Sequence, residues 1–179
     1  MKTNYLKEIL VEDKVTAHLH GTILKIKGPK GEIERDFNDP KVALSVQGNK
    51  IIISTKKYTK KEKTLFGAFV SHIKNMIVGV KDPRTYKLKV CSGHFPMNVA
   101  IVGHEFVIKN FFGETVPRKI IIPKGVEVKV NGNDVTITSP DLESAGMTAS
   151  RIENMCRITN RDIRRFQDGC YITEKPGRN

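Results

Sequence analysis

Cysteine and histidine are the side chains of this sequence with the clearest chemical potential, and one pair stands close together. Cys91 and His94 are three residues apart, a spacing found in half of a zinc site. No second Cys or His pair has complementary spacing, so we interpret the two as a buried thiol and a contact-making histidine. His18 and His20 would share one strand face, which a polar exposed face explains more simply than metal binding. We therefore predict no metal and no cofactor.

Catalytic signatures are missing from the sequence. It has no Walker phosphate-binding loop, no Gly-x-Gly-x-x-Gly, no Gly-x-Ser-x-Gly and no His-Glu-x-x-His. His94 or His104 would be the acid or base of an enzyme acting on RNA. Neither has a recognisable nucleophile or paired base, so we expect a protein that is not an enzyme and has no small-molecule substrate.

Positive charge points to a polyanionic partner. The 179 residues include 31 Lys and Arg against 19 Asp and Glu, a formal net charge of +12. Such an excess favours nucleic acid or an anionic membrane surface. The longest apolar runs, such as Ile51–Ile53 and Ile120–Ile122, are far below the roughly 20 residues that cross a bilayer. We expect no membrane segment and no secretion, and three cysteines without a pairing pattern suggest reduced thiols in the cytosol or nucleus.

The two kinds of basic residue are distributed unequally. Residues 1–90 carry a net charge of +10 and use Lys almost exclusively, whereas residues 91–179 carry only +2. Six of the nine Arg lie at or after position 151: Arg151, Arg157, Arg161, Arg164, Arg165 and Arg178. An Arg guanidinium matches phosphate bidentately, whereas the Lys ammonium is a hydrated point charge. Clustered Arg therefore marks the expected specific contact.

Two Lys-rich segments have both a functional and a structural explanation. The group at positions 56, 57, 60, 61 and 63 precedes a helix start, where it would bind phosphate or form a solvated hairpin tip. The loop Lys27–Gly31 has two Gly that would let the backbone approach a phosphate, yet the same residues describe a tight turn. Both alternatives stay open at this stage.

An internal duplication sets the architecture. Gly21, Ile26, Lys27, Gly31 and Glu32 recur 82 positions later, and Val42, Val46, Gly48, Asn49 and Ile53 recur 84 positions later. Both copies of the second stretch predict a hairpin with a Gly-Asn turn. Each copy then changes to a helical period, in the first at Leu65–Ile77 with Gly79 as the stop, in the second at Ala145–Cys156 after Asp141.

The elements predict an α+β fold of two duplicated domains, each an antiparallel-rich sheet packed against one helix. Pro83 cannot continue the first helix, so we place the domains at residues 1–82 and 83–179. Beyond the second helix we expect an extra short C-terminal helix from Asn160 to Gly169, which would bring Arg161, Arg164 and Arg165 close together. The tail from Glu174 to Asn179 is expected to be disordered.

Several segments resemble the universal large-subunit ribosomal protein six family in its eukaryotic and archaeal branch. They follow the family's order over nearly the whole chain: residues 27–31, 35–38, 71–80, 94–99, 108–114, 160–169 and 171–175. The resemblance implies two duplicated α+β domains, in agreement with the repeat. It also implies a structural constituent of the large ribosomal subunit that supports translation and binds large-subunit rRNA near the factor-binding region, close to the sarcin–ricin loop and the stalk base.

From the charge pattern and this resemblance we expect large-subunit rRNA and neighbouring large-subunit ribosomal proteins, including the stalk base, as partners. The candidate rRNA-binding residues are Lys27, Lys30, Lys87, Lys89, His94, Lys109, Arg118, Lys119, Arg151, Arg157, Arg161, Arg164, Arg165 and Lys175. Aromatic residues are few, so contacts to phosphates and RNA shape should outweigh contacts to unstacked bases. The expected location is the cytoplasmic ribosome, with nucleolar assembly in a eukaryote. The alternatives are a free RNA-binding regulator and an RNA-acting enzyme.

Overall fold

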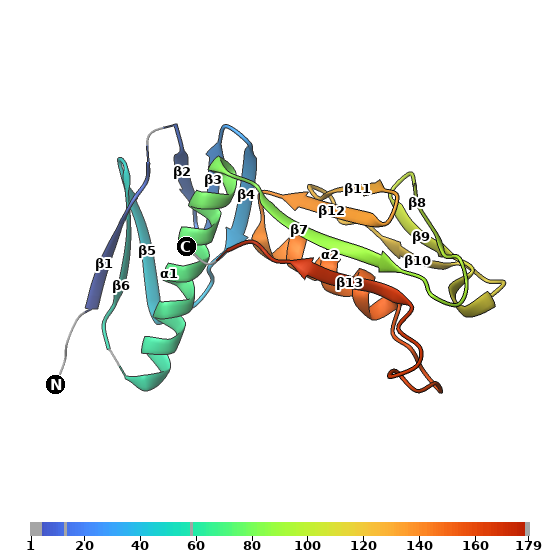
Figure 1. Cartoon of the computed structure of the whole chain (residues 1–179). Helices are drawn as coiled ribbons and strands as arrows, with labels where there is room; N and C mark the ends of the chain where they lie inside the picture. The colour runs from blue at the N-terminus through green and yellow to red at the C-terminus, as the bar shows by residue number, and fades with distance from the viewer. Residues whose placement is uncertain (1–4, 13, 58, 178–179) are drawn as a thin grey trace. The chain divides into compact units, whose positions relative to one another are not determined.

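The chain folds into two compact units, Met1–Pro83 (unit 1) and Arg84–Asn179 (unit 2). The computed structural model describes residues 5–12, 14–57 and 59–177 (Figure 1). Of the tail expected to be disordered, Glu174 is the last residue of a strand, so the prediction is wrong there, whereas Arg178 and Asn179 lie outside the described residues. The independent folding of the two halves stays a prediction.

The described part of unit 1 is two three-stranded antiparallel sheets and one helix. One sheet has the order β1-β6-β5, with β1 at Tyr5–Leu10, β6 at Lys50–Thr55 and β5 at Val42–Gln47. The other has the order β2-β3-β4, with β2 at Thr16–His20, β3 at Ile23–Gly28 and β4 at Gly31–Asp36. Helix α1, Lys60–Lys81, packs on strands of both sheets. One helix therefore closes the core between two sheets, where the sequence predicted a single sheet.

The apolar periodicity of α1 builds that core as predicted. Phe66, Phe69, Ile73 and Ile77 are buried, and the helix ends on Asp82, which is extended. The prediction that Gly79 stops the helix is wrong. Gly79 is a buried position two residues before the end, because the glycine has helical neighbours on both sides and Pro83 supplies the real break. Neither this helix nor any other in the described segments is apolar over a length sufficient to cross a bilayer.

Unit 2 repeats this plan with one additional strand. A four-stranded sheet has the order β11-β12-β7-β13, with β11 at Glu127–Asn131, β12 at Asp134–Ser139, β7 at Arg84–Cys91 and β13 at Gly169–Glu174. A three-stranded sheet has the order β10-β9-β8, with β10 at Arg118–Ile121, β9 at Glu105–Lys109 and β8 at Asn98–Val102. Helix α2, Leu142–Met155, packs on β7, β12, β13 and β10, and the short 3-10 helix η1 spans Phe111–Gly113. Asp141 accepts hydrogen bonds from the N–H groups of Glu143 and Ser144, as an N-cap does.

The duplication is confirmed down to backbone angles. Gly21 and Gly103, at the turns of β2–β3 and β8–β9, have φ of 63° and 62°, and Gly48 and Gly132 in the predicted hairpins have 57° and 60°. Glycine adopts this left-handed region without the Cβ penalty. Strand β13 has no counterpart in the first copy and lies beside β7 (Figure 1). The α+β duplicated fold is thus confirmed.

The predicted extra C-terminal helix is wrong. Between Met155 and β13 the chain forms loops and turns, and in the turn at residues 162–166 the Asp162 carbonyl accepts from the N–H groups of Arg165 and Phe166 at 3.0 Å. Asn160 takes a left-handed φ of 60° instead of capping, and Gly169 is in β13 opposite Cys91. Because β13 pairs with β7, the end of residues 160–169 adopts extended backbone. This pairing outweighs the weak helical periodicity of the segment.

Candidate nucleic-acid interface

A buried carboxylate joins two loops of unit 2 that are far apart in sequence. Asp168 is only 2% exposed. Its oxygens accept from the N–H of Gly93 at 2.8 Å and of His94 at 3.2 Å, and Nδ1 of His94 lies 3.2 Å from Oδ1. The residues between β7 and β8 are thereby fixed against the segment that leads into β13.

The environment of Asp168 keeps its side chain ionised. Burial is the largest single influence and raises the pKa of Asp168. The hydrogen bonds from Gly93 and His94 together outweigh burial and hold the pKa below its ordinary value. The buried charge therefore orders both backbone N–H groups at neutral pH.

An aromatic stack continues from this carboxylate to the surface. The ring centroid of His94 lies 4.7 Å from that of Phe166, which lies 5.8 Å from that of Phe112. The guanidinium carbon of Arg161 is 5.0 Å from each of the Phe112 and Phe166 rings. Cation–π contact orients this exposed Arg and leaves its hydrogen-bond donors available to a phosphate. We call His94, Phe112, Arg161, Phe166 and Asp168 the loop cluster.

The backbone around the loop cluster is strained. Phe112 has a φ of 50°, in the left-handed region that bulky side chains rarely adopt, and the nearby Asn110, a residue type that tolerates this region, has a φ of 62°. Such strain costs of order 1–3 kcal/mol and persists only where packing enforces it. Here Phe112 packs edge-on against the buried Phe111 at 4.8 Å. Packing thus holds this surface in one conformation at a cost in folding free energy.

The other two Arg of the predicted trio differ from Arg161. Arg164 pairs with Asp162, with Nη2 2.8 Å from Oδ2, and Arg165 is exposed. The hydrogen bond from Arg164 lowers the pKa of Asp162 below its ordinary value. The three Arg share one loop, but only Arg161 is held by aromatic rings.

Several predicted site residues of unit 2 are engaged within the protein. The Arg118 guanidinium binds both oxygens of Glu114, donates to the carbonyl of Met155 and lies 4.2 Å from the Phe111 ring centroid. This hydrogen bonding lowers the pKa of Glu114. Arg118 consequently anchors the start of β10 and is a poor candidate for RNA contact. Lys87 pairs with Glu174 at 2.8 Å, and Lys119 with Glu105 at 3.2 Å.

Other predicted residues of unit 2 lie on its surface. Lys89 is exposed on β7, where it is the direct cross-strand neighbour of Tyr171. The remaining exposed members are Lys109 on β9, Arg151 on α2, Arg157 after α2, and Lys175 after β13. These exposed side chains come from different elements of unit 2.

The loop between β3 and β4 in unit 1 has a structural explanation. A Cβ at Gly28 would lie 2.7 Å from Cγ2 of Val80, and the N–H of Lys30 donates to the Val80 carbonyl at 3.0 Å. The glycine and one backbone donor therefore serve the docking of α1 on β3. Lys27 and Lys30 have exposed side chains, and any phosphate contact there would use those ammonium groups.

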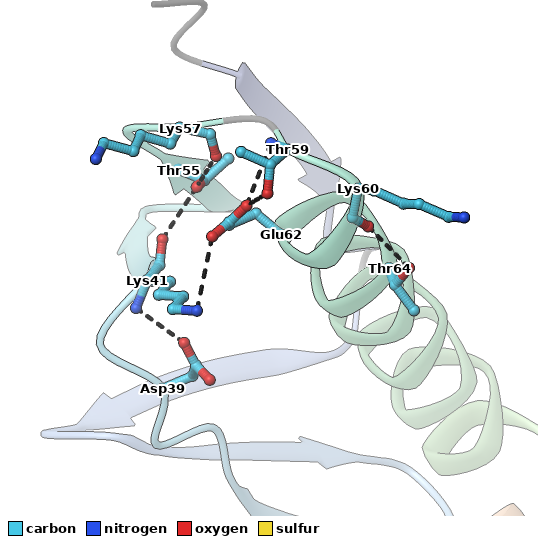
Figure 2. A network of polar contacts seen from close by, with 8 residues as sticks. All are labelled: Asp39, Lys41, Thr55, Lys57, Thr59, Lys60, Glu62 and Thr64. Carbon is cyan, nitrogen blue, oxygen red and sulfur yellow. Dashed lines mark hydrogen bonds and ion pairs between the residues drawn. The ribbon is translucent and has the colours of Figure 1, made fainter.

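The Lys-rich group does not all precede the helix as predicted: Lys56 and Lys57 come before α1, whereas Lys60, Lys61 and Lys63 lie in its first turn together with the acid Glu62. Glu62 accepts from the N–H and the hydroxyl of Thr59 and pairs with Lys41 at 3.7 Å (Figure 2). The Thr55 hydroxyl lies within hydrogen-bond distance of the carbonyl oxygens of Lys41 and Lys57, at 3.0 and 2.8 Å. The N-terminus of a helix carries a partial positive charge, which neighbouring lysines destabilise. The carboxylate of Glu62 stabilises it. Polar contacts with Lys41 and Thr55 thus hold the described residues on either side of the start of α1.

The cysteines and histidines lie apart from one another in chemical role. The structure shows no group of three or more potential metal ligands among the described side chains. Cys91 is partly exposed, so the prediction that it is buried is wrong, because it lies on the face of β7 opposite the core residue Val90. Cys156 and Cys170 are the buried thiols. As expected, His94 makes structural contacts, and His18 and His20 lie on the exposed face of β2.

Sequence reasoning missed the residues that organise the loop cluster. Phe112, Phe166 and Asp168 come from two separate segments, and only the tertiary structure places them around His94 and Arg161. Aromatic residues adjoining the Arg-rich segment, as in Arg165-Phe166, were the available signal.

Two repeats of one α+β design, the second carrying a basic and aromatic loop cluster, define a strongly basic, duplicated α+β protein. The chain matches the family described as Ribosomal protein L6 over residues 11–83 and 95–169, and it belongs to that family. It is 42% identical to the large ribosomal subunit protein uL6 of the archaeon Nanoarchaeum equitans, over 96% of this chain and 94% of the relative. It is 42% identical to the protein of that name from Saccharolobus solfataricus, over 94% of each, and 41% to that from Methanocella arvoryzae, over 98% and 99%.

Family membership confirms the resemblance found in the sequence. It also confirms the prediction of a non-enzymatic protein, because members of this family are structural ribosomal proteins.

Proposed function

We propose that this protein is a structural constituent of the large ribosomal subunit that binds large-subunit rRNA through the loop cluster of unit 2. Arg161 carries the proposal, because the Phe112 and Phe166 rings hold its guanidinium at the surface. A pre-oriented Arg loses less conformational entropy when it binds phosphate than a free Lys does. The relatives named above are large-subunit proteins, which supports the assignment.

The binding region we propose is near the factor-binding region of the subunit, close to the sarcin–ricin loop and the stalk base. Neighbouring large-subunit proteins, including the stalk base, would be the protein partners. The net charge of +12 suits burial against RNA. The protein would act in cytoplasmic ribosomes, with nucleolar assembly in a eukaryotic cell.

The salt dependence of binding tests the proposal. With in-vitro-transcribed large-subunit rRNA, engaging about six phosphates should give a log–log slope near −5, the B-DNA coefficient serving as a guide. A slope near zero would contradict backbone binding. Co-sedimentation with large subunits after a high-salt wash separates a ribosomal component from a free RNA-binding regulator, which would be washed off.

Two sets of substitutions test which half holds the specific contacts. Changing Arg161, Arg164 and Arg165 to Lys keeps the charge but removes bidentate geometry. We expect this triple variant to weaken association with large subunits more than five Lys→Gln changes at positions 56, 57, 60, 61 and 63. Circular dichroism must first show both variants folded. Normal assembly of the Arg→Lys variant with failure of the Lys→Gln variant would move the main contact to unit 1.

A further inference from the structure

A cavity of about 840 Å³ opens beside the Arg-rich loop and has no part in the contacts described so far. It lies where three parts of unit 2 meet: the last turn of α2, the segment before β13, and the paired strands β7 and β13. Six of its lining residues matter here: Cys91, Asn154, Arg157, Ile163, Gln167 and Tyr171.

The walls of the cavity are apolar and partly exposed. Tyr171 is 40% exposed and Ile163 is 67% exposed, so both side chains are accessible to a molecule that enters the cavity. A Cβ at Gly169 would lie 3.3 Å from Cζ of Tyr171. The absence of a side chain at Gly169 therefore leaves room for the Tyr171 ring. The structure therefore presents a flat aromatic surface, backed by main chain, to whatever enters.

A hydrogen bond joins two of the elements that line the cavity. Glu153, another lining residue, accepts the N–H of Ile172 at 3.0 Å and thereby ties the end of α2 to β13. Burial raises the pKa of Tyr171 above its ordinary value, so the phenol is neutral at physiological pH. A neutral ring on a fixed strand is suited to stacking.

Polar groups on the cavity lining complement a nucleotide. Asn154 and Gln167 each offer an amide donor and acceptor, the pattern that reads the edge of a base. Arg157 supplies a cation to the same cavity, and Lys89 is the cross-strand neighbour of Tyr171. A ligand with a flat heteroaromatic ring, an amide-like edge and a negative charge satisfies all of these groups.

We propose that this cavity receives one unstacked nucleotide of the bound RNA, with its base on Tyr171, its base edge at Asn154 and Gln167, and its phosphate at Arg157. The inference rests on the proposed rRNA binding and adds a base-reading site to it. A peptide segment of a neighbouring protein is the competing occupant. The lining itself holds one cation, Arg157, and one acid, Glu153, whose carboxylate already accepts the Ile172 N–H. The exposed Lys89 beside Tyr171 and the exposed Arg165 of the lining loop add positive charge at the rim, which favours RNA.

Removal of the Tyr171 ring tests the proposal with large-subunit rRNA as the probe. Stacking on an aromatic side chain contributes about 1–3 kcal/mol per base, so Tyr171→Ala should weaken binding by about 5- to 150-fold. The log–log salt slope should stay that of the wild type, because a neutral ring releases no counterions. Tyr171→Phe keeps the ring and should bind within about twofold of the wild type. Ultraviolet irradiation of the wild-type complex should attach a nucleotide to Cys91 or Tyr171.

The outcomes separate this site from the function on which it rests. Wild-type affinity of a folded Tyr171→Ala variant would overturn the nucleotide site while leaving salt-dependent rRNA binding intact. Normal binding to rRNA with lost assembly into subunits would overturn it in favour of a protein partner. If Tyr171→Ala misfolds, Gln167→Ala on the exposed loop replaces it, and its unchanged affinity would overturn the site. A wild-type protein that does not bind rRNA would refute the proposed function itself.

Discussion

Asp168 accepts the backbone N–H of Gly93 at 2.8 Å across 75 residues of sequence. The carboxylate is buried, and it also holds the backbone N–H of His94. If the protein binds rRNA as proposed, this negative charge acts by shaping the loops, since its field opposes a polyanionic partner. Removal of this charge should weaken rRNA binding if loop shape decides the affinity, and strengthen it if net charge decides.

Asp168→Asn should weaken rRNA binding although it makes the protein more positive. An amide offers one acceptor oxygen, so the loop of Gly93 and His94 loses part of its anchor and the loop cluster loosens. We expect a loss of about tenfold, which corresponds to one charge-assisted hydrogen bond of about 1.4 kcal/mol. Asp162→Asn is the matched control, because it removes an exposed carboxylate of the same loop. That variant should bind rRNA as tightly as the wild type or more tightly; tighter binding by both variants would show that charge alone decides.

The contribution of Asp168 to stability should depend on pH in one direction. Its folded-state pKa lies below the ordinary value of 3.8, so the stabilisation is complete above that value and is lost as pH falls through the folded pKa. The difference in unfolding free energy between wild type and Asp168→Asn should be constant from about pH 8 to pH 5 and shrink below about pH 4. Urea titrations at pH 7 and pH 3 measure it. A difference that grows on acidification would refute the lowered pKa.

Two glycines of unit 1 should respond oppositely to alanine. Gly67 is an exposed position of α1 with no atom within 4 Å of an added Cβ, so Gly67→Ala should stabilise by roughly 0.5–1 kcal/mol through reduced backbone entropy. Gly28→Ala would place a methyl 2.7 Å from the side chain of the buried Val80 and should destabilise by roughly 1–3 kcal/mol. Denaturant unfolding of both variants gives the comparison. Equal effects would mean that α1 does not pack on β3 as described.

Thiol labelling should distinguish Cys91 from the other two cysteines. Cys91 is partly exposed, whereas Cys156 and Cys170 are buried. Their mutual hydrogen bond lowers the pKa of Cys156 and, together with burial, raises the pKa of Cys170. In the native protein one thiol per chain should therefore react quickly with the labelling reagent, and in the denatured protein all three should react. Bound rRNA should protect Cys91 if the cavity it lines is occupied, and fast labelling of Cys156 would show that the end of α2 opens.

The sequence by itself determined the repeat, the hairpins and the two helical faces. These features depend on local periodicity and on Gly residues at turns, such as Gly48 and Gly132, whose left-handed φ needs no distant partner. The same local reasoning placed a helix after Asn160 and ended α1 at Gly79, and both predictions were wrong. The weak helical signal of residues 160–169 lost to pairing of Gly169 with Cys91.

Only the tertiary structure decided which basic residues share a surface with aromatic rings. Nothing in the sequence distinguishes the roles of Arg118 and Arg161. In the structure Arg118 is hydrogen-bonded to Glu114. Arg161 instead makes cation–π contacts with the rings of Phe112 and Phe166. Asp168 shows the same limit, because its role depends on N–H groups of residues 74 and 75 positions away. Contacts over such distances arise from packing of whole elements, and no local pattern of residues encodes them.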